Sequence, residues 1–85
     1  MGRHPVIQKG SIKMADITYE IVEHIATLST GKTGWTKEVN LVSWNGGEAK
    51  VDIREWSPDH TRMGKGVTMT MDELDLLVDA FSNRA

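Results

Sequence analysis

A hairpin signature in the middle of the chain constrains the fold more than any other feature of the sequence. Residues 35–44 and 49–56 both alternate between apolar and polar side chains with the period of two that β-strands require. The segment Asn45-Gly46-Gly47 lies between them, and Asn and Gly accept the positive φ angles of a tight turn at low steric cost. The sequence therefore predicts two antiparallel strands, Trp35–Trp44 and Ala49–Trp56, joined by a short turn.

Two further strands are expected outside this hairpin. Residues 17–28 are rich in β-branched side chains and contain neither Gly nor Pro, which favours a strand over a helix. Residues 67–69 form a short strand after the segment Gly64-Lys65-Gly66. Residues 1–13 follow neither structural period and are interpreted as a flexible extension or a remnant of cloning, so that residues 14–85 form the domain.

The C-terminal segment has the pattern of an amphipathic helix that begins with a capping box. The Thr70 hydroxyl is placed to accept from the Glu73 amide, while the Glu73 carboxylate accepts from the Thr70 amide. Apolar residues then recur at spacings of three to four residues, at Met71, Leu74, Leu77, Val78 and Phe81. We expect this stripe to cover one face of the sheet and to pair with the same helix of a second copy in a two-fold dimer. The predicted dimer interface comprises Leu74, Leu77, Val78 and Phe81.

The predicted fold is of the α+β class, with a four-stranded antiparallel sheet followed by one C-terminal helix. A chain of 85 residues builds only one small core, and such cores often depend on disulfides, a metal or a partner subunit. The chain has no Cys, and its three His residues lack the spacing of metal ligands, so we expect neither a metal site nor a cofactor. Self-association is the remaining way to complete the core.

Hydropathy and charge argue against several classes of protein. No run approaches the roughly 18–20 apolar residues that span a bilayer, and no apolar secretory segment stands near the N-terminus. We therefore expect a cytoplasmic protein without membrane contact. The formal net charge of −2 argues against a broad grip on duplex phosphates, for which the pI is usually above about 9.

Tryptophan is the residue type that points to a ligand. Strand parity places Trp44 and Trp56 on the face opposite Leu41 and Ile53. If the core lies on the Leu41 side, the two indole rings stand on the open face beside Arg54. Flat rings interleaved with cations form a platform for unstacked bases, worth roughly 1–3 kcal/mol per base. Because a duplex hides the faces of its bases, the sequence predicts a site for single-stranded nucleic acid.

The candidate binding residues are aromatic or basic, and three of them have a structural alternative. Trp35 is equally well a lid over the edge of the core. Arg54 either binds phosphate or pairs with Asp52 or Glu55 on the surface. Lys65 is either a solvated turn residue or a phosphate contact, since its flanking Gly residues allow backbone amides to approach a phosphate. The complete predicted set is Trp35, Lys37, Trp44, Lys50, Arg54, Trp56, Arg62 and Lys65.

Two features that resemble catalytic motifs do not support an enzyme. Asp59 and His60 are adjacent, but neighbouring side chains on an extended chain point apart, and no Ser or Cys is evidently placed for activation. The segment Gly64-Lys65-Gly66 lacks the preceding Gly and the following Ser or Thr of a phosphate-binding GxxxxGK[ST] loop. We therefore expect a non-enzymatic protein with no catalytic residues.

The chain resembles the positive cofactor four family of transcriptional coactivators, most closely its bacterial YdbC-type branch, in the segments GWTKEVNLVSWNGG, KVDIREWSPDH and MGKGVTMTMDEL. The similarity covers residues 15–81. It implies a curved antiparallel sheet, dimerisation through the helix, and channels for single-stranded DNA. By position, Arg54 and Lys65 match phosphate contacts of the family, and Trp56 matches a base-stacking aromatic. Trp44 lies near a second family aromatic, in a hairpin of different length.

The sequence thus predicts a homodimer that binds single-stranded DNA with little sequence preference, because stacking and phosphate contacts read no base edges. Its expected process is transcription or DNA maintenance, with the transcription machinery as a partner and a nucleoid location in a bacterium. Two alternatives stay open. The ligand can be RNA, or the protein can be an interaction module whose Trp face docks a transcription or replication partner.

Overall fold

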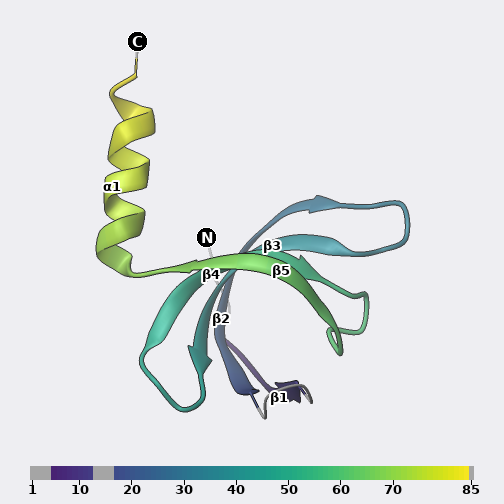
Figure 1. Ribbon diagram of the computed structural model, residues 1–85. Coiled ribbons are helices and arrows are strands. Elements are labelled where there is room, and N and C mark those ends of the chain that lie inside the picture. Colours follow the sequence, from purple (N-terminus) through teal and green to yellow (C-terminus); the bar gives the residue numbers. More distant parts are fainter. Residues whose placement is uncertain (1–4, 13–16, 85) are drawn as a thin grey trace.

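The computed structural model describes the backbone of residues 5–12 and 17–84, and the side chains of residues 17–84. Its strands form one antiparallel sheet in which each strand lies beside the next one in the sequence, and one helix follows the sheet (Figure 1). The elements are β1 (Pro5–Ile12), β2 (Ile17–Thr30), β3 (Thr36–Trp44), β4 (Ala49–Trp56), β5 (Met63–Met69) and α1 (Met71–Ser82).

The four predicted strands and the C-terminal helix are confirmed. Strand β5 begins at Met63, earlier than predicted, because the Gly-rich segment pairs with β4 and brings Gly66 opposite Arg54. Strand β1 is an element that the sequence pattern does not predict. It lies within the predicted extension, and residues 1–4 and 13 of that extension fall outside the described residues. Pro5 is the first residue of β1, an edge position where a missing backbone N–H is tolerated.

Local signals decide both the central turn and the start of the helix. Asn45 and Gly46 have φ angles of 52° and 75°, and the Gly47 amide donates to the Trp44 carbonyl (2.9 Å), which closes the predicted hairpin. At the helix, Glu73 N donates to Thr70 Oγ1 (3.1 Å), and Thr70 N donates to Glu73 Oε1 (2.8 Å). The predicted capping box is therefore confirmed.

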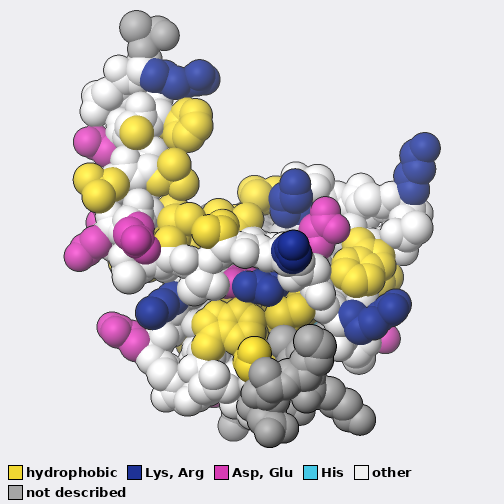
Figure 2. All heavy atoms as spheres, in the orientation of Figure 1, with side chains coloured by type: hydrophobic (Ala, Val, Ile, Leu, Met, Phe, Trp, Pro, Cys, Tyr) yellow, Lys and Arg dark blue, Asp and Glu magenta, His cyan; other side chains and the backbone are white. Residues whose placement is uncertain are grey.

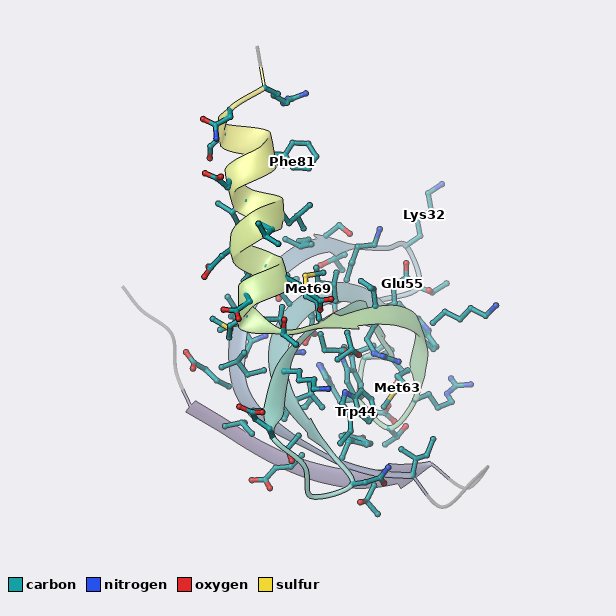
Figure 3. The ribbon with its side chains drawn as sticks, turned by 60° about the vertical axis from the view of Figure 1, so that its left-hand side comes forward. Lys32, Trp44, Glu55, Met63, Met69 and Phe81 are labelled. Carbon is teal, nitrogen blue, oxygen red and sulfur yellow. The ribbon has the colours of Figure 1, made fainter. Side chains whose placement is uncertain are left out.

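The core lies on the sheet face that was expected to be open. The sheet curves strongly, and its buried cluster consists of Tyr19, Ile21, Val42 and Trp56. Figure 3 shows Trp44 and Met63 in the space that the curved strands enclose, where both pack against this cluster. On the Leu41 and Ile53 side, where the sequence predicts the core, Val51 is buried, but Leu41 and Ile53 are only half-buried, so this side does not carry the main cluster as predicted. The curved sheet buries the face with the large rings, because these rings pack against one another and bury their area without a covering helix.

Helix α1 stands away from the sheet instead of covering it (Figure 1). Only Thr70 connects the end of β5 to the start of α1, and the helix leaves the sheet from this edge strand. None of its residues is buried, and Phe81 is 61% exposed. The expected covering of one sheet face by the helix of the same chain is therefore wrong. In the described part of the chain, no helix is long and apolar enough to cross a bilayer.

Candidate nucleic-acid interface

A hollow of about 440 Å³ lies beside the edge strand β5, at the end of the sheet that carries the β3–β4 turn. We call it the Trp44 hollow; it is lined by Ile17, Trp44, Gly47, Glu48, Lys50, Arg54 and Thr68. Figure 2 shows Lys and Arg side chains gathered over β5, with hydrophobic side chains beside them. The structure thus brings three predicted residues, Trp44, Lys50 and Arg54, together at one site. Ile17, Glu48 and Thr68 were not predicted, because polar or aliphatic residues at strand ends carry no binding signature.

The Trp44 ring is fixed between an aromatic and a cationic neighbour. The ring of Tyr19 lies 5.9 Å away between centroids, at a tilt of 52°, and the Arg54 guanidinium carbon lies 4.9 Å from the Trp44 ring centroid. Such a contact between a guanidinium and an indole is attractive and orients both groups. Trp44 remains half-buried, so part of its surface is open to the hollow.

Arg54 is held by a buried carboxylate. Asp52 is 0% exposed, and its two oxygens accept from Arg54 Nε (2.7 Å) and Nη2 (2.8 Å) in a bidentate pair. Asp52 Oδ1 also accepts from Thr68 Oγ1 (3.0 Å), so this buried charge is satisfied. Of the two pairing partners considered from the sequence, the structure selects Asp52, and it places the pair inside the fold rather than on the surface.

Trp56 does not lie on an open surface. The side chain is 0% exposed, its ring lies 5.4 Å from the Tyr19 ring, and the His60 ring stacks on it at 5.6 Å with an interplanar angle of 21°. The prediction of a solvent-facing Trp56 is therefore wrong. The turn after β4 folds His60 back over the indole, and strand parity does not reveal this covering. In this conformation no base can reach the ring, and Trp56 instead supports the Tyr19 ring that contacts Trp44.

A polar network lies on the same face as the core. Glu38 is buried and accepts from Asn40 Nδ2 (3.2 Å) and from the Thr36 hydroxyl, and it bonds His60 Nε2 (2.8 Å). Burial raises the pKa of Glu38, but the bonds from Thr36, Asn40 and His60 outweigh it and hold the pKa below its usual value. His24 Nδ1 bonds Asn40 Oδ1 (2.7 Å) at the edge of this network. No local motif in the sequence announces a network whose members come from three separate segments.

The turn from Ser57 to Thr61 engages Asp59 and His60 with separate partners. Asp59 Oδ1 accepts from Ser57 Oγ (2.9 Å), Thr61 N (3.1 Å) and Thr61 Oγ1 (2.7 Å). The bonds from Thr61 and then that from Ser57 lower the pKa of Asp59 to about 2. His60 Nε2 bonds Glu38 in the core network. Each side chain therefore has a structural role that the adjacency of the two residues does not suggest.

A second aromatic and cationic pair lies at the β2–β3 end of the sheet. The Arg62 guanidinium carbon is 5.5 Å from the Trp35 ring centroid. Trp35 lines a hollow of about 450 Å³, the Trp35 hollow, together with Ser29, Thr30, Gly31, Thr33, Lys37 and Glu55. Three further predicted residues, Trp35, Lys37 and Arg62, thus gather at this second place. Lys65 is exposed on β5 and lines neither hollow.

An open, curved antiparallel sheet, a free amphipathic helix and ring–cation pairs at both ends of β3 define a small domain with a surface suited to unstacked bases. The sequence model of the family described as Transcriptional Coactivator p15 (PC4) matches residues 31–80, and the chain belongs to this family. An uncharacterized protein of Treponema pallidum (strain Nichols) is 43% identical over 76 residues, which cover 89% of each chain. The closer resemblance to the YdbC-type branch stays a prediction.

Proposed function

We propose that the protein binds single-stranded DNA with little sequence preference. Single-stranded DNA binding and a coactivator role are properties of the family to which the chain belongs. The observation that carries the proposal for this chain is the Trp44 ring, oriented by Arg54 and open to a hollow that Lys50 also lines. A ring whose face is accessible beside a cation stacks any base, because every base has a π-face.

The proposed contacts divide into stacking and phosphate binding. Trp44 is the principal stacking residue, and Trp35 with its Arg62 partner is a second one. The phosphate contacts are assigned to the exposed cations Lys37, Lys50 and Arg62 near the two rings, and to Lys65 on β5. None of these contacts reads a base edge, which is why little sequence preference is expected.

The unpartnered helix supports a homodimer as the binding species. Leu77, Val78 and Phe81 are between 41% and 61% exposed on a helix that touches little of its own sheet. Leaving this stripe in water is costly, and an isologous pairing of two helices removes it from water in both copies. A dimer of this kind carries two copies of each ring–cation pair.

A titration with oligo-dT tests the proposed site. Trp44→Ala removes the open ring and should weaken binding by about 5- to 150-fold, which corresponds to roughly 1–3 kcal/mol for one stacked base. Leu76→Ala is the matched control, because Leu76 is an exposed apolar side chain on the helix, away from both hollows. Fluorescence anisotropy of a labelled dT oligomer measures both variants.

Three competing outcomes are distinguishable in the same experiment. Equal affinity of wild type and Trp44→Ala contradicts the proposed site. Stronger binding of an equivalent RNA oligomer in competition makes RNA the ligand. No binding to any bare oligonucleotide, across a range of salt concentrations, leaves the protein-interaction alternative.

A further inference from the structure

We infer that Arg54 is a positioning residue for the Trp44 ring, locked in place by the buried carboxylate of Asp52. The inference rests on the proposed binding of single-stranded DNA at the Trp44 hollow. It assigns to Asp52 and Arg54 a role that the family likeness does not supply.

The carboxylate of Asp52 sets the plane of the guanidinium. Its two oxygens lie 2.7 and 2.8 Å from Arg54 Nε and Nη2, which is the parallel fork that a carboxylate and a guanidinium form. The Thr68 hydroxyl donates to Asp52 Oδ1 (3.0 Å) from the neighbouring strand β5 and holds the carboxylate in turn. A side chain held by two parallel bonds has little freedom to rotate.

The two N–H groups of Arg54 Nη1 are also engaged. Arg54 Nη1 donates to the Gly64 carbonyl (3.1 Å) and to Met63 Sδ (3.4 Å), and the side chain is only 13% exposed. To turn its fork to a phosphate, Arg54 must leave Asp52 unpaired in the interior, which is strongly unfavourable. The Nε–Nη2 fork of Arg54 therefore stays on Asp52, and the guanidinium carbon stays over the Trp44 ring, 4.9 Å from its centroid.

Strand β5 is shaped to allow this arrangement. Gly66 lies opposite Arg54 in the sheet, and a Cβ atom at Gly66 would collide with Arg54 Cβ and with the Ile53 carbonyl. The absence of a side chain lets β5 approach closely enough for the Gly64 carbonyl to reach Arg54. The requirement for glycine at this position follows from the position of the Arg54 side chain.

Arg54→Lys separates positioning from charge. Lysine keeps the positive charge beside Asp52 but loses the planar fork and the stacking on Trp44. We expect binding to oligo-dT to weaken by about 2- to 30-fold, the range of one ring–cation contact, while the salt dependence of binding stays as in wild type. Lys50→Met is the comparison variant, because loss of one phosphate contact should reduce the salt slope by about one.

A double-mutant cycle with Trp44 shows whether Arg54 acts through the ring. In a Trp44→Ala background, Arg54→Lys should cause no further loss of affinity, because the ring that it orients is absent. Additive losses in the double mutant would overturn the inference, because they would show that Arg54 contributes to binding independently of the ring.

Two milder variants guard against loss of the fold. Asp52→Asn keeps the size of the side chain, and Thr68→Val removes only the hydroxyl that supports Asp52. Both should weaken binding without changing the salt slope, and circular dichroism with a urea titration checks that each remains folded. Unchanged affinity in folded Asp52→Asn and Thr68→Val contradicts the locking role of Asp52. If Trp44→Ala itself leaves binding unchanged, the proposed site fails. If Trp44→Ala weakens binding and only the Arg54 variants have no effect, the proposed site stands and this inference fails.

Discussion

At the scale of single residues, the buried polar groups of this small core are as important as its apolar ones. Glu38 and Asp52 both lie inside the sheet, and each is satisfied by neighbours from other segments. Removing one partner of such a group leaves a buried charge or donor unsatisfied, which costs about 1–3 kcal/mol or more. These residues therefore link the stability of the domain to the geometry of its binding surface.

Glu38 makes stability depend on pH in the acid range. The pKa of Glu38 is lower in the folded chain, so the unfolded chain binds the proton more readily. The stabilisation by the Glu38 carboxylate is therefore complete above the ordinary pKa of 4.5 and is lost as the pH falls through the folded pKa. The melting temperature of wild type should fall below pH 4.5. Glu38→Gln should be less stable at pH 7 and should lose less stability on acidification. Asp59→Asn is the control. The pKa of Asp59 is lowered to about 2, so the stabilisation that its carboxylate provides is lost at lower pH.

Trp56 should affect folding before it affects binding. Trp56→Ala removes a fully buried indole and should destabilise the domain by about 3–5 kcal/mol, a large fraction of the stability of a small domain. Trp56→Phe should remain folded, with a smaller loss. Urea denaturation measures both. A Trp56→Ala variant that unfolds at the wild-type urea concentration but fails to bind oligo-dT would instead assign the ring to the ligand.

At the scale of elements, α1 is the part of the chain whose environment is incomplete. Its apolar stripe extends from the sheet with no covering element among the described residues, and Figure 3 shows Phe81 well clear of the strands. A helix of 12 residues is marginal by itself in water, so packing against a partner is the expected source of its stability. This is the physical reason for the proposed dimer.

A charge on the stripe should break the proposed dimer. Phe81→Glu places a carboxylate in the expected helix–helix interface and should reduce the mass in solution to that of the 9.5 kDa chain. Leu76→Glu is the matched control, because Leu76 is 71% exposed and lies on the opposite side of a helix with 3.6 residues per turn. Analytical ultracentrifugation measures both. A wild-type monomer at micromolar concentration contradicts the proposed pairing.

At the scale of the whole molecule, the two ring–cation pairs set an upper bound on the ligand length that is needed to reach both rings. Trp35 and Trp44 stand at opposite ends of β3, and nine steps of about 3.3 Å place them at most about 30 Å apart. A stacked strand rises about 3.4 Å per nucleotide, so roughly nine nucleotides reach from one ring to the other.

Affinity should therefore rise steeply with length up to about nine nucleotides per protomer and more gently beyond. Trp35→Ala should weaken binding of dT12 by several-fold and leave dT4 almost unaffected, because only the longer strand reaches the Trp35 hollow. Competition titrations with a series of dT lengths provide the measurement. Equal affinities of wild type and Trp35→Ala at every length would make Trp35 the lid over the core edge that the sequence also allows.

The sequence by itself determined the features whose causes are local. Asn45 and Gly46 set the hairpin turn through their positive φ angles, Thr70 and Glu73 set the start of the helix through their capping bonds, and alternation set the two strands of the hairpin. It also placed Trp44 among the binding candidates, where the structure finds an open hollow.

Only the tertiary structure decided which face of the sheet became the core. Alternation defines two faces but does not say which one the curvature closes. Trp56 is buried because Tyr19, which is distant in the sequence, and His60, which a turn brings back, pack on its ring. The bond from Thr68 that holds Asp52 and the pairing of β1 with β2 likewise depend on neighbours from other strands. Such contacts form only when the sheet has folded, so residue spacing along the chain does not encode them.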